Sequence, residues 1–201
     1  MGTVAPNPYY TDEIAAECME KIFLPTVNAM NAEGRSFEGC LYFGLMLTPD
    51  GAKVIEYNCR FGDPETQVVL PLLDADLYDV FEAVSRHELD KADIKWHDGS
   101  CACVIMASGG YPESYPKGIP MSGFDANGQI ADSPCRVYHA GTKLAEDGTF
   151  LTNGGRVIGV TARGKTLREA LDTAYEGVSE ISFDGMQYRR DIGQRALKAL
   201  D

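Results

Sequence analysis

The chain has 201 residues, of which 44% are hydrophobic, and this composition is typical of a folded globular protein with one large core or two small ones. Its 18 basic and 30 acidic residues give a net charge of −12, which argues against general binding to nucleic acid or to an anionic membrane. No apolar run reaches the roughly 18 residues that a membrane span requires, and the N-terminus has no signal-peptide pattern. These features predict a cytoplasmic protein.

The cysteines and histidines show no metal-binding pattern. The six cysteines lack Cys-x-x-Cys spacing. Cys101 and Cys103 are spaced to share one face of a predicted strand, but no matching Cys or His pair lies near them. His87, His97 and His139 stand in unrelated contexts and are predicted to be surface or hydrogen-bonded structural residues. The sequence therefore predicts reduced thiols, most of them buried, and no zinc site.

The first half of the chain contains helical and strand signals in turn. Apolar residues at helical spacing predict a helix from Thr11 to Asn31, which Thr11 caps and Pro25 kinks. Two apolar runs flank the turn signal "PDGA" and predict a β-hairpin over residues 40 to 58. Residues 65 to 73 and 76 to 88 are predicted to form two further helices.

The second half of the chain has a different pattern of predicted secondary structure. The charged stretch "HELDKADIKWHDGS" predicts a boundary near residue 98, and the runs after it predict short, mostly antiparallel strands. A helix is predicted from Thr166 to Ile181. The fold class is therefore expected to be α+β, with one unit over residues 1 to 98 and another over residues 99 to 201.

The segment "VIEYNCRFGDPE", residues 54 to 65, concentrates polar groups where a predicted strand ends. Alternation along a strand places Glu56 and Asn58 on one face, and Arg60 follows them if the backbone stays extended. Carboxylate and amide oxygens are ligands that Mg²⁺ accepts, and a guanidinium matches phosphate oxygens. A solvated strand edge with an internal ion pair has the same spacing, so the pattern alone leaves both interpretations open.

Two acids follow at the strand end. Gly62 and Pro64 predict a turn there, which places Asp63 and Glu65 where either can meet an amine or a hydroxyl group.

The extended motif "VIEYNCRFGDPETQVVLPLL" closely resembles that of the phosphoribosylamine–glycine ligase family of the ATP-grasp superfamily. Further blocks resemble the family in the same order, among them "EGRSFEGCLYFGLMLT", "ASGGYPESYPKG", "TNGGRVIGVTARG" and "FDGMQYRRDIG". The resemblance covers essentially the whole chain.

This resemblance implies roles for the motif residues. Glu56 and Asn58 match the family's magnesium or manganese ligands, and Arg60 matches a catalytic arginine near the transferred phosphate or the substrate. The residues implied in substrate contact are Arg60, Gly62, Asp63 and Glu65. In the last block, Arg189 and Arg190 are within possible reach of a phosphate, although that block is more typical of packing.

The implied reaction joins glycine to 5-phosphoribosylamine and converts ATP to ADP and phosphate, in the second step of de novo purine synthesis. Glycine would first be activated as glycyl phosphate, and the amine would then attack its carbonyl carbon. The implied small-molecule partners are glycine, 5-phosphoribosylamine and ATP, with no nucleic acid or membrane partner.

The resemblance is to the second half of the family's sequence only. It implies the C-terminal half of an ATP-grasp domain followed by a small β-rich domain of the rudiment single hybrid motif type. The N-terminal half, which carries the nucleotide-binding lysine, has no counterpart here, so the isolated chain is expected to be inactive. The alternative is a non-catalytic folded module that needs the missing half or another partner.

The stretch "GVTARGKT", Gly159 to Thr166, matches the P-loop pattern letter for letter. Its context argues against a P-loop, because the alternating strand continues past Gly159 and too few residues follow for further parallel strands. The preferred interpretation is a strand, a tight turn at Gly164 and a helix capped by Thr166.

Overall fold

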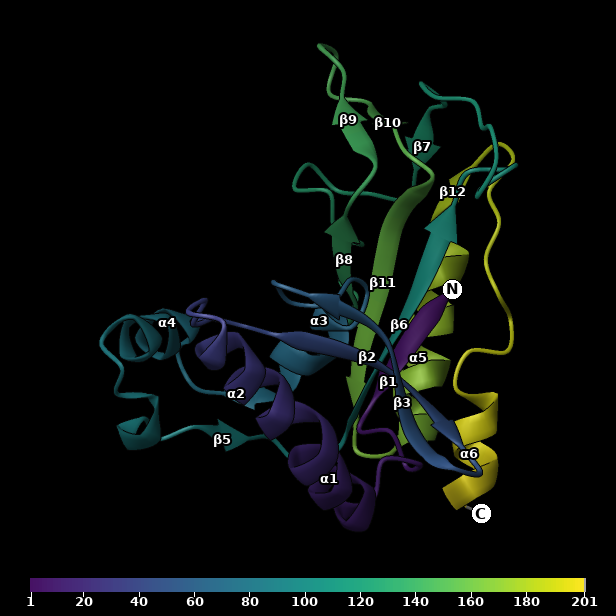
Figure 1. Ribbon diagram of the computed structural model, residues 1–201. Helices are drawn as coiled ribbons and strands as arrows, with labels where there is room; N and C mark the ends of the chain where they lie inside the picture. Colours follow the sequence, from purple (N-terminus) through teal and green to yellow (C-terminus); the bar gives the residue numbers. More distant parts are fainter. Residues whose placement is uncertain (201) are drawn as a thin grey trace. The chain divides into compact units, whose positions relative to one another are not determined.

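The computed structural model describes residues 1 to 200, and the chain forms two compact units within an α+β fold (Figure 1). The sheet unit comprises Met1–Asn7, Pro64–Leu72 and the chain from His97 onward. The hairpin unit comprises Pro8–Asp63 and Leu73–Trp96. The α+β class agrees with the expectation from sequence. No helix within residues 1 to 200 combines the length and apolar character that crossing a membrane requires.

The hairpin unit begins with a helical segment in three parts. These are α1 (Asp12–Cys18), a π-helical turn (Met19–Phe23) and α2 (Leu24–Ala32). The hydroxyl of Thr11 accepts a hydrogen bond of 3.4 Å from the backbone N–H of Ile14, which confirms the predicted cap.

The π-helical turn is a departure from the single helix that the sequence predicts. Pro25 lacks a backbone N–H and its ring crowds the carbonyl four residues back, so the α-helical ladder cannot run through it unchanged. Just before it, the backbone N–H of Leu24 bonds to the carbonyl of Met19, five residues back. The predicted disturbance at Pro25 is therefore accommodated by one wider turn.

The predicted hairpin is confirmed. It consists of the antiparallel strands β2 (Tyr42–Thr48) and β3 (Gly51–Asn58), which form a sheet of two strands. Gly51 adopts a φ of 91° at the turn, in the region that glycine enters without strain.

The helices predicted over residues 65 to 73 and 76 to 88 are both shorter than expected. The first is α3 (Thr66–Val69) with a 3-10 turn (Leu70–Leu72), and the second is α4 (Leu77–Ser85). Pro71 prevents the first from continuing as an α-helix, and the next residues form β4 (Leu73–Asp74). This strand pairs with β5 (Lys95–Trp96), after a 3-10 turn (Leu89–Lys91).

The sheet unit is built on an antiparallel sheet of four strands. In spatial order they are β1 (Gly2–Ala5), β6 (Ser100–Ala107), β11 (Arg156–Gly164) and β8 (Arg136–His139). Short strands extend the unit: β7 (Met121–Ser122), β9 (Thr142–Leu144), β10 (Phe150–Thr152) and β12 (Ser182–Phe183). Its C-terminal half contains the long helix α5 (Leu167–Glu180) and the short helix α6 (Gln194–Leu200). The antiparallel strands agree with prediction, whereas β1 was not predicted.

The sheet unit has a closed core. One cluster joins the sheet to α5 and α6 through buried aliphatic side chains, among them Val104, Met106, Val160, Leu171 and Leu197. A second cluster joins Cys101, Cys103 and Ile105 of β6 to Val68 and Leu72. The six cysteines are free thiols and four of them are buried, which confirms the prediction from their spacing.

The P-loop pattern lies in β11 and the start of α5. Strand β11 runs from Arg156 to Gly164 without ending at Gly159, and both its neighbours in the sheet are antiparallel. Thr166 caps α5 by accepting a hydrogen bond of 3.2 Å from the N–H of Glu169. The preferred interpretation of strand, turn and capped helix is confirmed.

Candidate functional site

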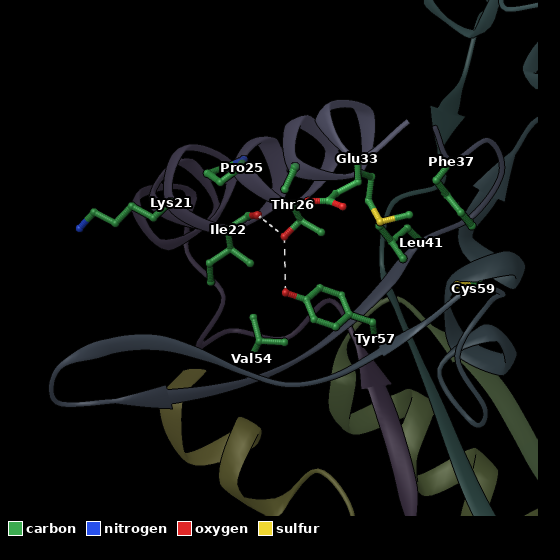
Figure 2. Close-up of a pocket in the computed structure, with 12 residues that line it drawn as sticks. Lys21, Ile22, Pro25, Thr26, Glu33, Phe37, Leu41, Val54, Tyr57 and Cys59 are labelled. Carbon is green, nitrogen blue, oxygen red and sulfur yellow. Dashed lines mark hydrogen bonds between the residues drawn. The ribbon is translucent and has the colours of Figure 1, made fainter. Parts of the chain in front are cut away.

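The strand that carries Glu56 contains a β-bulge. Gly44 pairs with Glu56 and Leu45 pairs with Val54, so Ile55 has no partner residue on β2. The bulge lets Val54 and Tyr57 both face helix α2, as Figure 2 shows, although they are three residues apart. Glu56 and Asn58 then share the opposite face of the hairpin.

Glu56 and Asn58 are in direct contact. The amide Nδ2 of Asn58 donates a hydrogen bond of 3.0 Å to Oε1 of Glu56. The remaining carboxylate oxygen and the amide Oδ1 accept no hydrogen bond from a described residue, so two hard oxygen donors stay available on one face. Such a pair fits Mg²⁺, which takes one or two protein carboxylates and completes its octahedron with water and substrate phosphate.

Gly44 makes room for the Glu56 side chain. A β-carbon at Gly44 would lie 2.9 Å from Cγ of Glu56, closer than real side chains approach. The sequence analysis did not single out this residue. A glycine inside the otherwise apolar strand "LYFGLML" was the available signal, because glycine weakens a strand unless it serves a bulge or a close approach.

Arg60 follows the strand and is exposed. Its Nη1 donates a hydrogen bond of 2.8 Å to the carbonyl of Phe61. Within the described residues, Arg60 forms no ion pair with Glu56, so the alternative of a strand edge held by that pair is not supported. The ring of Phe61 packs against that of Phe81, with centroids 6.2 Å apart, which fixes the backbone beside the arginine.

The residues predicted to contact substrate follow along the chain. Gly62 is buried and Asp63 is exposed at the end of the hairpin unit's first segment. Glu65 belongs to the sheet unit, where its carbonyl accepts hydrogen bonds from Val68 and Val69 at the start of α3. The motif thus crosses from one unit to the other between Asp63 and Pro64.

The block "FDGMQYRRDIG" is held by contacts within it and by a contact with α5. Arg189 makes two hydrogen bonds to the carboxylate of Asp191, of 2.8 and 2.6 Å, and these lower the pKa of Asp191. The hydroxyl of Tyr175 on α5 donates to the carbonyl of Arg189. Arg190 lies over the ring of Tyr188, 5.1 Å from its centroid. These contacts support a packing role for the block.

The described part of the chain contains no cluster of His, Cys, Asp or Glu side chains that would form a second metal site. Residues 1 to 200 contain no group of three or more His, Cys, Asp or Glu side chains that could hold a metal ion. His139 is hydrogen-bonded to Thr142 and to the carbonyl of Gly128, in keeping with the structural role predicted for it. The Glu56–Asn58 pair is therefore the candidate that remains, with ligands still to be supplied from outside it.

Models of two domains of one enzyme family match the chain. The model of the phosphoribosylglycinamide synthetase ATP-grasp (A) domain matches residues 1–66, and the model of the C domain of the same synthetase matches residues 101–195. The matched ranges include the whole hairpin motif and most of the sheet unit.

Individual relatives agree. The phosphoribosylamine–glycine ligase of Synechocystis sp. is 50% identical over 199 residues, which cover 98% of this chain and 46% of the relative. The trifunctional purine biosynthetic protein adenosine-3 of Gallus gallus is 46% identical over 201 residues, which are 100% of this chain and 20% of that protein.

Solved structures show the same relationship. The crystal structure of phosphoribosylamine–glycine ligase from Thermotoga maritima matches with a TM-score of 0.76 and 31% identity, over 96% of this chain and 46% of the other. A biotin carboxylase from Campylobacter jejuni, at 12% identity and a TM-score of 0.65 over 97% of this chain and 44% of its own, shows the shared fold alone. The chain spans about half the length of the single-function relatives that it matches. It belongs to the phosphoribosylglycinamide synthetase family, and it carries the C domain and part of the ATP-grasp domain.

Proposed function

We propose that the chain is the C-terminal part of a cytoplasmic enzyme that joins glycine to 5-phosphoribosylamine at the expense of ATP, giving glycinamide ribonucleotide, ADP and phosphate. The observation that carries this proposal is the contact between Glu56 and Asn58, which presents two oxygen donors on one face of the hairpin. The reaction is inferred from membership of the family, and the oxygen donors on the hairpin are the ligands that a divalent metal ion would need for it. We further propose a boundary near residue 98 between two sequence domains, over residues 1 to 98 and 99 to 201; this division differs from the two compact units, because Met1–Asn7 and Pro64–Leu72 pack in the sheet unit.

We assign separate roles to the residues of the motif "VIEYNCRFGDPE". Glu56 and Asn58 would hold Mg²⁺ or Mn²⁺, whose role is to neutralise charge on the transferred phosphoryl group. Arg60 would turn from the Phe61 carbonyl to present its fork of N–H groups to phosphate or acyl-phosphate oxygens. Gly62, Asp63 and Glu65 would contact glycine or phosphoribosylamine.

The chain is expected to be inactive alone. Catalysis by positioning and charge stabilisation requires both walls of a site to be present together. The relatives are about twice as long as this chain, which supports a second wall supplied by the N-terminal half.

A covalent fusion tests the proposed function directly. The part of the Synechocystis ligase that precedes the matched region would be joined to this chain, and ADP release would be measured with and without glycine and phosphoribosylamine. We expect release that depends on both substrates. Arg60→Ala should lower kcat by at least about tenfold, since a lost charge contact in a transition state costs that much or more. Arg35→Ala, at an exposed arginine outside the motif, is the matched control.

A folded fusion without substrate-dependent ADP release would overturn the proposal. That outcome would favour the alternative of a non-catalytic module. Turnover by the unfused chain would contradict the expectation that the chain is inactive alone.

A further inference from the structure

The two units differ sharply in how completely they bury their apolar side chains. In the sheet unit more than twenty apolar residues are buried in two clusters. In the hairpin unit, all of which the structure describes, Cys18 is the only buried apolar side chain. Large side chains of that unit remain well exposed, including Leu24 at 52%, Met46 at 55% and Ile55 at 62%. Exposed apolar surface marks an interaction site where it is contiguous, as it is in a groove lined by apolar side chains.

A groove lies between α2 and β3, and we call it the helix–hairpin groove; of the exposed apolar side chains of the unit, Tyr57 lines it. It has a volume of about 700 Å³ and lies wholly within the hairpin unit. Figure 2 shows Val54 and Tyr57 rising from the strand toward Ile22 and Thr26 on the helix. The helix side of the groove continues along α2 through Ala29.

The groove exists because the helical segment contacts only part of the hairpin. Phe23 packs on Phe43 of β2, with ring centroids 4.4 Å apart, and Phe43 packs on Tyr57 at 5.2 Å. The only polar contact across the groove is a long one, 3.4 Å between the hydroxyls of Thr26 and Tyr57 among the described residues. Tyr57 remains 51% exposed, so the floor of the groove is open.

The hairpin also offers unpaired backbone. Within residues 1 to 200, β2 and β3 pair only with each other, so each has a free edge. Such an edge is a template for an added strand, whose alternate side chains would enter the space beneath the helix.

The helix–hairpin groove belongs to the ATP-grasp part of the chain. The groove lies between Lys21 and Cys59, inside the range matched by the ATP-grasp domain model, whereas the C domain model matches the unit with the closed core. The Synechocystis relative has more than half of its length outside the match. The helix–hairpin groove thus lies in the domain of which this chain carries only part.

We infer that the helix–hairpin groove is the docking surface for the N-terminal half of the ligase, which places apolar side chains between α2 and β3. This inference rests on the proposed function for the identity of its partner. The docked half completes the core of the hairpin unit, and it covers the face of β3 opposite Glu56 and Asn58. The groove therefore positions the site without contributing a ligand to it.

Co-expression tests the inference with two separate polypeptides. This chain would be produced with a tagged N-terminal part of the Synechocystis ligase, comprising the residues before the match, and the recovered complex would be measured by affinity capture and size exclusion. We expect a 1:1 complex. Ala29→Arg should reduce its recovery at least tenfold, because Ala29 lines the groove and the new side chain would fill it with charge. Asn28→Arg, exposed on the same helix and outside the groove, should stay within twofold.

Amide hydrogen exchange gives a second readout that does not depend on a variant. Exchange in α2 and β3 should slow in the complex, while exchange in α5 should not change. Circular dichroism of each variant alone checks that its fold is retained. Equal recovery with both arginine variants, or unchanged exchange in α2 and β3, would overturn the inference.

Two further outcomes separate this inference from the proposed function. An active fusion whose separated halves do not associate through the groove would leave the function standing and remove the docking surface. A groove-dependent complex formed with an inactive fusion would do the reverse. Self-association of this chain that Ala29→Arg abolishes, without capture of the N-terminal part, would assign the groove to a second copy and contradict the inference.

Discussion

Gly44 lies directly across the hairpin from Glu56, and the absence of a side chain at Gly44 leaves the space that Glu56 occupies. The two residues are paired in the register of β2 and β3, beside the bulge at Ile55. A β-carbon at position 44 would lie 2.9 Å from Cγ and 3.6 Å from the carbonyl oxygen of Glu56. The position of the candidate metal ligand is thus set by a glycine on the neighbouring strand.

Gly44→Ala should therefore weaken metal binding by this chain without unfolding it. The new methyl group pushes Glu56 from its position beside Asn58, and we expect the Mn²⁺ dissociation constant to rise several-fold by paramagnetic relaxation of water. Met46→Ala, at an exposed residue of the same strand, is the control and should have no effect. Unchanged Mn²⁺ affinity in Gly44→Ala would show that the position of Glu56 does not matter for the ion.

Glu56→Gln tests the metal assignment itself. The substitution keeps the shape and the oxygen that accepts from Asn58 but removes the charge, which is the main attraction for a divalent cation. Binding to the isolated chain is expected to be weak already, because substrate phosphates normally complete the coordination. Titration with Mn²⁺ should show a further clear loss in Glu56→Gln and none in Asp50→Asn, at the hairpin turn. Equal binding by both variants would remove the assignment.

The sequence predicted the hairpin well because its signals are local. Alternation, apolar runs and the "PDGA" turn are all visible within residues 40 to 58, and so is the spacing that puts Glu56 beside Asn58. The bulge at Ile55 was not predicted, because it depends on pairing with β2, and neither was the role of Gly44. Strand β1 was missed for a similar reason: its four residues become a strand by pairing with β6, nearly a hundred residues later.

Helix lengths show the same limit. Strong capping signals at Thr11 and Thr166 fixed the starts of α1 and α5. The predicted helix over residues 65 to 73 was too long, because Leu73–Asp74 is drawn into a strand by a partner at Lys95–Trp96. Tertiary pairing overrode local propensity there. The roles of Arg60, Asp63 and Glu65 remain predictions, because they depend on contacts with substrates and with the rest of the enzyme.

The six thiols should differ in reactivity toward Ellman's reagent, which reacts with the thiolate. Cys59 is exposed, whereas burial raises the pKa of Cys101 to about 12 and also raises that of Cys40. At pH 8 the native protein should show one fast-reacting thiol, which Cys59→Ser removes and Cys101→Ser does not. All six should react in urea. A fast phase that persists in Cys59→Ser would mean that another thiol is accessible, and would contradict the burial of Cys101 and Cys103 in β6 or the partial burial of Cys40 before the hairpin.

Stability should fall with acid partly through Asp125. Backbone N–H groups of Gln129 and Asn127 donate to its carboxylate at 2.9 and 2.8 Å and lower its pKa from the ordinary value of an aspartate. A lowered native pKa contributes stability above the unfolded pKa, and that contribution is lost as the pH falls through the native value. The difference in urea midpoint between the wild type and Asp125→Asn should therefore be larger at pH 7 than at pH 2.5. Asp172→Asn, at an exposed carboxylate of α5 without a hydrogen bond to a described residue, should give a difference that changes less with pH. An equal dependence in both variants would exclude this role for Asp125.

The last prediction separates the cap of α5 from the P-loop pattern that it imitates. Thr166 and Glu169 bond reciprocally, and the backbone N–H of Lys165 also donates to Glu169 at 2.8 Å. Thr166→Ala should lower the free energy of unfolding by about 1 kcal/mol, measured by urea denaturation, because it removes an N-cap. Lys165→Ala keeps the backbone bond and should change neither stability nor the ATP affinity of the fusion protein. In a true P-loop that lysine would contact phosphates, and its loss would weaken ATP binding by at least tenfold, about 1.4 kcal/mol. A loss of that size in Lys165→Ala, with stability unchanged, would contradict the structural interpretation of "GVTARGKT" and restore the nucleotide-binding one.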